Sequence, residues 1–439
     1  MKKKNVFLGL IVLFILTSCS TKEQEYTAIL PSRTEVVKPI HKNEFRESDC
    51  PQRVQEGDPK IVNGYFQFKG ASDGNRQVDP QIAIGGGYIV NATNSGLLVY
   101  NKEGNYIDGV HQRCFQNGID PKMFYDIHNK VFGFDLWVYW DSLQIKPVNI
   151  SISETNNPLG AWNTYPVSIT EAVDGGAIGY SKKWIAYNYP GGDNNTFVLK
   201  MSEAKAGKPA TIYHFKGSFG QPAYVQDDID DLYFLKIEDD HFVITRITEA
   251  EDGSPIAQEI SNKPHHLQYI DYPPQSPQKD TEQLTSSGDR NPKNLVFQSG
   301  YLWFSQAVNC NDRSAVQWHQ IKPDGSIIQT GIIKSDSSNY IQTTIAVNKN
   351  MDVLIGFQET NANMFISPRM AFRYAGDPQG TLHDIISLGE GKGPTDGVAW
   401  GDYSGSIIDG DQLSDLWTIQ SITNQKGRGE TVIVKVPFE

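Results

Sequence analysis

The chain has 439 residues, of which 39 are basic and 51 are acidic, so its formal net charge is -12. Aromatic residues make up 11% of the chain, which is enough to fill a core and excludes a disordered or collagen-like protein. The acidic balance excludes nucleic acid as an expected partner, because binding phosphates requires clustered Lys and Arg. No internal apolar run reaches the length of about 18 residues that a transmembrane helix needs.

The first 18 residues are predicted to be a signal peptide. Three lysines at positions 2–4 precede the apolar segment 6–16, and Leu-Thr-Ser-Cys follows at 16–19. This ending resembles the bacterial lipobox, in which the Cys is lipidated and becomes the first mature residue. The resemblance implies lipidation of Cys19, membrane attachment through that lipid, and an outer-membrane lipoprotein that is surface-exposed or faces the periplasm. An ordinary secretory signal is the alternative. Residues 21–25 resemble the short charged export tag of surface lipoproteins, and a plain polar linker is the alternative.

The segment 19–58 is polar and weakly patterned, so we expect a lipid-anchored flexible tether. Residues 59–439 are then expected to form a single domain. Besides Cys19 the mature chain has three cysteines, and Cys50 is expected to pair with Cys114, which leaves Cys310 as an unpaired thiol.

From residue 61 the chain consists of short alternating apolar runs separated by Gly, Asn, Asp and Pro, a pattern typical of strands. One segment recurs: an alternating run, a turn, then an aromatic or aliphatic strand. Its seven copies begin at Asp79, Asp120, Asp174, Gln221, Asn291, Gln342 and Gly401. Each interval leaves room for two more strands, so the sequence predicts an all-β, seven-bladed β-propeller. Residues 61–69 and 431–436 are expected to pair in one blade and close the ring. A β-sandwich array or another mixed β protein is the alternative.

In such a ring, the loops entering the inner strands and the loops after the second strands share one face, where ligands are expected to bind. The candidate residues on this face are His111, Arg113, Asp120, Asp174, Tyr187, Tyr189 and Arg290. Five of them have a structural alternative. The two Asp residues suit capping of backbone amides, the two Tyr residues suit core packing or a contact between blades, and Arg290 suits a structural salt bridge.

Several segments carry a resemblance to secreted bacterial propellers. They are Val-Asp-Pro-Gln-Ile-Ala at 78–83, Asn-Pro-Leu-Gly at 157–160, Ser-Ala-Val-Gln-Trp at 314–318 and Trp-Gly-Asp-Tyr-Ser-Gly at 400–405. Among propellers with chemistry, the chain resembles ulvan lyases and related enzymes that eliminate across uronic acids. The resemblance implies a His and a Tyr as base and acid, a cation at the uronate carboxylate, and a structural zinc held by Cys and His.

Elimination requires a base for the C5 proton, an acid for the departing O4, and a cation for the developing enolate. We therefore assign His111 and Tyr187 or Tyr189 to catalysis, and Arg113, Arg290, Asp120 and Asp174 to substrate binding. Cys310 and His319, with His265 and His266 in reserve, are candidate ligands of a structural zinc. Free residues without a metal are the alternative. Catalysis itself is expected to need no cofactor.

The sequence thus predicts a carbohydrate-active lipoprotein. Its expected activity is that of a lyase or dehydratase that forms an unsaturated uronate on a uronic-acid-containing polysaccharide or oligosaccharide such as ulvan. Two alternatives are a glycoside hydrolase that uses paired Asp carboxylates and a non-catalytic propeller that binds glycans or other partners.

Overall fold

The computed structural model describes residues 27–42, 58–72, 77–111, 119–137, 146–169, 175–189, 195–395 and 400–438. Within these ranges the regular structure is β-strand apart from a short helix, α2 (Met201–Lys205). No helix of the described part is long and apolar enough to cross a bilayer.

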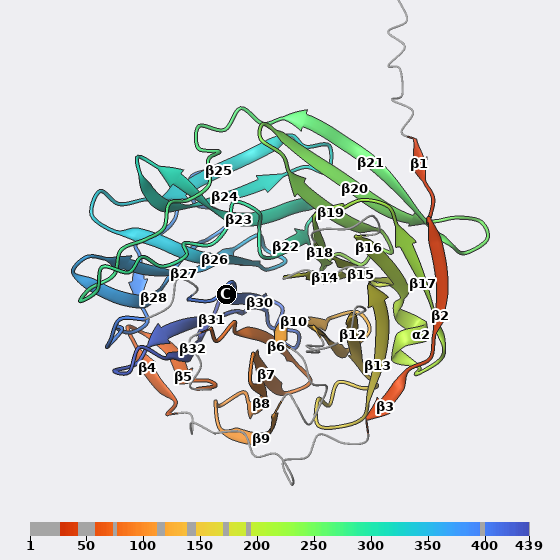
Figure 1. Cartoon of the computed structure of the whole chain (residues 1–439), viewed down its shortest axis with the longest axis horizontal. Helices are drawn as coiled ribbons and strands as arrows, with labels where there is room; N and C mark the ends of the chain where they lie inside the picture. The colour runs from red at the N-terminus through yellow and green to blue at the C-terminus, as the bar shows by residue number, and fades with distance from the viewer. Residues whose placement is uncertain are drawn as a thin grey trace, which may run out of the picture.

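The described strands form seven successive antiparallel units, called here blades 1–7 in chain order, arranged around a common centre (Figure 1). The all-β propeller prediction is confirmed, and each of the seven predicted repeats begins within or up to four residues before an innermost strand. These inner strands are β6 (Gln81–Gly85), β10 (Ile119–Asp126), β14 (Ala177–Tyr180), β18 (Gln221–Val225), β22 (Leu295–Gln298), β26 (Asn339–Val347) and β30 (Gly405–Ile408). Near the centre, β14 pairs with β18 and β18 with β22 in parallel.

The other strands of each blade follow outward by antiparallel pairing. The second strands are β7 (Tyr88–Thr93), β11 (Val131–Trp137), β15 (Trp184–Asn188), β19 (Leu232–Ile237), β23 (Tyr301–Cys310), β27 (Val353–Asn361) and β31 (Leu416–Thr423). The third strands are β8 (Gly96–Asn101), β12 (Lys146–Ser153), β16 (Thr196–Lys200), β20 (His241–Glu249), β24 (Arg313–Ile321), β28 (Met364–Arg373) and β32 (Gly429–Val436). The fourth strands are β9 (Tyr106–His111), β13 (Trp162–Ile169), β17 (Ala210–Phe215), β21 (Pro255–Pro264), β25 (Ile327–Ile333), β29 (Ile386–Ser387) and β5 (Tyr65–Lys69).

Blade 7 closes the ring with strands from both ends of the chain, as the sequence predicted. β5 pairs with β32, with Lys69 opposite Val432 and Phe66 opposite Lys435, and β4 (Lys60–Val62) adds a fifth strand outside β5. This closure holds the N-terminal segment that leads into blade 1 to the last blade by backbone hydrogen bonds, which protects edges that an open array would expose.

An N-terminal strap runs along the outside of blades 4, 3 and 2 (Figure 1). Its strands are β1 (Ala28–Ile29), β2 (Arg33–Val37) and β3 (Ile40–Lys42), which pair with β21, β17 and β13. The expectation of a flexible tether is therefore wrong for these residues. The physical reason is that the outer edges of three blades carry unpaired backbone groups, and the strap satisfies them without a continuous apolar sequence. Residues 19–26 and 43–57 lie outside the described part.

Side chains reinforce the strap. The guanidinium of Arg33 and the carboxylate of Glu35 both contact Nε2 of the buried His214 in β17, at 3.0 and 2.8 Å. Burial lowers the pKa of His214, and the bond to Glu35 opposes this shift.

Deletion of residues 1–42 is expected to leave a folded propeller with a Tm lowered by several degrees. Ring closure uses β5, which the deletion spares, but three outer edges lose their partner strands. Differential scanning calorimetry checks this, with deletion of residues 1–26 as the control that keeps the strap. Equal Tm values for the two truncated proteins would show that the strap adds no stability.

Candidate functional site

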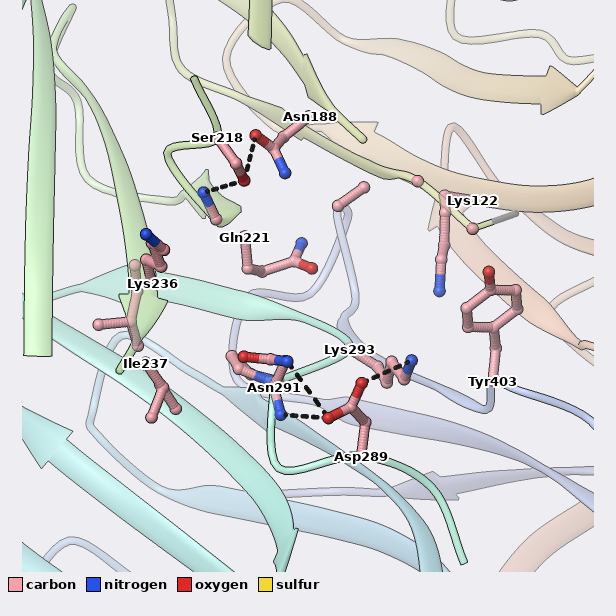
Figure 2. A pocket seen from close by; sticks show the side chains of 16 residues that line it. Lys122, Asn188, Ser218, Gln221, Lys236, Ile237, Asp289, Asn291, Lys293 and Tyr403 are labelled. Carbon is pink, nitrogen blue, oxygen red and sulfur yellow. Dashed lines mark hydrogen bonds and ion pairs between the residues drawn. The ribbon is translucent and has the colours of Figure 1, made fainter. Parts of the chain in front are cut away.

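A cavity of about 400 Å³ opens on the face where the inner strands begin (Figure 2). Its lining comes from the loops that enter inner strands and from the ends of second strands, in blades 2, 3, 4, 5 and 7. The lining residues are Lys122, Gly175, Gly176, Ala177, Asn188, Ser218, Gly220, Gln221, Leu235, Lys236, Ile237, Asp289, Asn291, Pro292, Lys293 and Tyr403. This size is typical of small-ligand sites in proteins.

The cavity is cationic although the chain is acidic. Three lysines and one aspartate line it, so its formal charge with all groups ionised is 3 - 1 = +2. Lys236 is paired with Glu238 at 2.7 Å, whereas among the described residues the nearest carboxylate oxygen to Lys293 belongs to Asp289 at 4.0 Å. The positive charge of the cavity lining therefore favours an anionic ligand.

Neutral polar groups surround the lysines. Asn188 accepts a hydrogen bond from the Ser218 hydroxyl at 3.1 Å, and Asn291 donates to Asp289 at 3.2 Å. Gln221 also points into the cavity (Figure 2). Amides and hydroxyls of this kind donate and accept hydrogen bonds, as recognition of sugar hydroxyls requires.

Lys122 is placed at the cavity by a bulge in β10. Asp120 has a φ of 56°, and the pairing register shifts between Ile119 and Lys122, which re-aims the side chains there. The Lys122 side chain is 3% exposed, and its Nζ lies 2.9 Å from the centroid of the Tyr403 ring. Within the described part of the chain Nζ has no hydrogen-bond partner. A buried amine without a partner is costly and is unusual outside functional sites.

The surroundings of Lys122 shift several pKa values. Burial, aided by the Lys293 charge, lowers the pKa of Lys122 to about 7. Burial raises the pKa of the adjacent Asp135 to about 8, while its hydrogen bond from Tyr187 opposes that shift. Burial and nearby carboxylates hold the pKa of Tyr403 well above its ordinary value. Near neutral pH the cavity therefore holds an amine that is partly uncharged beside a phenol that keeps its proton.

Two glycines make room for the phenols. A side chain on Gly176 would overlap the hydroxyl of Tyr187, and a Cβ on Gly175 would lie 3.2 Å from the hydroxyl of Tyr403. Gly175 also has a φ of +77°, which favours glycine. The Gly-Gly pair that precedes β14 therefore lets the backbone pass directly over both tyrosines.

Gly176→Ala is expected to destabilise the protein by about 1–3 kcal/mol, the usual cost of overpacking, because the new methyl group must displace Tyr187. Chemical denaturation measures this change. Gly376→Ala is the control, since nothing lies within 4 Å of the added methyl group there. A Gly176→Ala variant as stable as the control would contradict the packing described.

Several sequence-predicted residues are not at this cavity. His111 ends β9, the outermost strand of blade 1, where its backbone pairs with Gly96. The structure therefore does not bring it together with Tyr187 in β15 of blade 3. The prediction erred because the strand entering blade 2 begins after an intervening segment, not at His111. Arg113, Asp174 and Cys19, and also Cys50 and Cys114, lie outside the described residues.

The two tyrosines of the sequence prediction are both buried and do not line the cavity. Tyr187 is fully buried beneath Gly176 and bonded to Asp135, so it supports the site from below. Tyr189 is 1% exposed, packs 6.3 Å from the Tyr187 ring and does not line the cavity. Its position matches the core-packing alternative.

The two remaining substrate-binding candidates have structural partners. Arg290 donates to Asp239 at 2.8 Å and to the carbonyl of Ile270 at 3.2 Å, and its guanidinium lies over the Tyr272 ring. The salt bridge with Asp239 matches the structural alternative for Arg290. Asp120 is buried at the β10 bulge, where its charge acts on Lys122 and Tyr403.

Cys310 and His319 cannot share a metal ion. Cys310 ends β23 opposite Arg313, while His319 lies six residues farther along β24, a distance of about 20 Å for a strand. His319 is fully buried, bonds Thr330 at 2.9 Å, and has its pKa lowered to about 3 by burial. Sequence proximity misled the prediction because the strand carries the two side chains apart. The described residues contain no cluster of three metal-ligating side chains.

Lys122, Lys293, Tyr403 and Asp135 were not predicted as site residues from the sequence. A signal was present in the repeats, because Asp-Pro-Lys at 120–122, Asn-Pro-Lys at 291–293 and Gly-Asp-Tyr at 401–403 occupy equivalent positions before or within inner strands. The third residue of each triplet reaches the cavity. The informative feature was the lysine at position 122. It lies within an inner strand, where a charged side chain must face the centre of the ring and is therefore costly to bury.

No family model matches the chain, and no curated protein does. Among solved structures, it is similar to a quinoprotein alcohol dehydrogenase-like protein from Bacteroides thetaiotaomicron (10% identity, 76% of each chain, TM-score 0.43). It is also similar to α-L-arabinofuranosidases from Fusarium graminearum (8% identity, 92% of this chain and 98% of that chain, TM-score 0.37) and Clostridium thermocellum (11% identity, 72% and 95%, TM-score 0.35). Likeness at this level carries no conclusion about activity.

Proposed function

We propose that this protein binds a uronic-acid-containing polysaccharide or oligosaccharide at the cavity and cleaves it by β-elimination, as a lipoprotein anchored through Cys19. The observation that carries the proposal is the buried, unpartnered amine of Lys122 against Tyr403, in a cavity with two further lysines. Lys122 takes the role of base that the sequence analysis gave to His111.

Charge supports the choice of substrate class. A polyanionic glycan is repelled by a chain of net charge -12, so productive contact requires a local cationic site. Lys293 and Lys236 provide ammonium groups on the wall formed by blades 5 and 4. An ammonium beside the uronate carboxylate also makes the C5 proton more acidic, because it stabilises the enolate that forms when the proton leaves.

The proposed reaction balances within the site. The uncharged Lys122 amine removes the C5 proton, and the electron pair of that bond forms the C4=C5 double bond. The C4–O4 bond breaks, and the Tyr403 hydroxyl donates its proton to O4 of the leaving group. The Lys122 ammonium, which lies against the Tyr403 ring, then returns its proton to the phenolate. Both groups end in their starting states.

The direct test is incubation of the purified protein with ulvan and other uronic polysaccharides, followed by ultraviolet absorbance of the double bond conjugated to the carboxylate. Growth of this absorbance supports the proposal. New reducing ends without the absorbance would identify a hydrolase instead, and retention of the glycan with neither signal would identify a binding protein.

A further inference from the structure

Asp135 faces Lys122 across the β10–β11 pair. The two residues are direct register partners, and the backbone N–H of Lys122 donates to Oδ1 of Asp135 at 3.2 Å. Cross-strand partners place their side chains on the same face of a sheet. Asp135 is fully buried, and its Oδ2, like Nζ of Lys122, has no hydrogen-bond partner in the described part of the chain.

Resting on the proposed function, we propose that Asp135 sets the pH at which the Lys122 amine becomes uncharged and thereby the pH at which the site becomes active. Asp135 does not line the cavity, so it is a positioning residue that acts through Lys122.

The charged neighbours of the pair act in opposite directions. Around Lys122, the carboxylates of Asp135, Asp79 and Asp120 favour the ammonium, with Asp135 the strongest of the three, and Lys293 favours the free amine. The Tyr403 ring covers Nζ.

Around Asp135, Tyr187 donates a hydrogen bond that favours the carboxylate, and Tyr224 is the other titratable neighbour. Asp135 itself has a raised pKa, about 8, so the amine and the carboxyl group titrate over overlapping ranges.

The titrations of Lys122 and Asp135 are coupled because both groups are buried. When the Asp135 carboxylate forms, its charge holds a proton on Lys122, because opposite charges attract strongly where water is excluded. Asn at position 135 keeps the size and removes this charge, so Lys122 should lose its proton at lower pH. Met at position 293 removes the opposing cation, so Lys122 should lose its proton at higher pH.

The experiment is an NMR titration of the intact protein labelled with ¹³C at lysine Cε, in which the Lys122 resonance is the one missing from Lys122→Met. We expect Asp135→Asn to lower the Lys122 midpoint by up to about one pH unit, because Asp135 is only partly ionised over the range in which Lys122 titrates. Lys293→Met should raise it. Lys236→Met is the matched control and should leave the midpoint nearly unchanged, since Lys236 lines the cavity but is not among the groups with the largest effects on Lys122.

Tyr187→Phe keeps every charge and removes only the hydrogen bond to Asp135, so it tests the same link if Asp135→Asn does not fold. It should also lower the Lys122 midpoint, by a smaller amount. Absence of a shift in both variants, or a shift upward, would overturn the inference.

The pH–rate profile gives the functional readout. In the wild type, activity should rise with pH through about 7, because the base must lose its proton first, and Asp135→Asn should move this rise to lower pH. A shifted NMR midpoint in a protein without eliminating activity would refute the proposed function and leave this inference standing. An unshifted midpoint in a protein that does have eliminating activity would refute this inference and leave the proposed function standing.

Discussion

Lys122→Met is expected to reduce the rate of elimination by about 10²–10⁴-fold, the range that a general base supplies. Met is unbranched and similar in length, so the packing against Tyr403 is retained and only the amine is lost. The initial rate of double-bond absorbance under saturating substrate measures the effect.

Stability separates a catalytic role of Lys122 from a structural one. Its amine is buried without a hydrogen-bond partner in the described part, so replacing it by an apolar group should leave Tm unchanged or raise it. A structural lysine would give the opposite result, with Tm and activity falling together. Lys349→Met, an exposed lysine in the turn after β26 on the opposite face, should change neither. Wild-type activity in Lys122→Met would remove this residue from the mechanism.

Tyr403→Phe is the second variant with a large expected effect, a loss of about 10²–10⁴ in kcat. The substitution removes only the hydroxyl that is proposed to donate the proton to O4, while the ring that packs against Lys122 remains. KM should therefore change little, because the lysines proposed to bind the carboxylate still line the cavity.

The matched control is Tyr301→Phe, a partly buried tyrosine next to Trp303 on the opposite face, which should retain full activity. A substrate with a better leaving group at C4 should be less affected by Tyr403→Phe, because it needs less protonation in the transition state. A kcat above one tenth of the wild-type value in Tyr403→Phe, or an equal loss with every leaving group, would argue against Tyr403 as the acid.

The sequence alone located the seven inner strands and the ring closure. Period-2 alternation and turn residues are local properties, and each blade is built from neighbouring segments of the chain, so a pattern in sequence maps directly onto strands. Pairing of 61–69 with 431–436 followed from counting, since seven repeats leave one blade incomplete. The face that carries the cavity followed from the alternating direction of successive strands.

Only the tertiary structure decided the site. Lys122 and Tyr403 are far apart in the sequence and meet because blades 2 and 7 converge at the centre, and no local signal encodes how far a loop reaches toward that centre. The strap was hidden for a related reason: its stability comes from backbone edges supplied by three other blades, not from its own side chains. His111 and Cys310 were misassigned because nearness along a chain does not set nearness in space once strands, at about 3.3 Å per residue, carry residues apart.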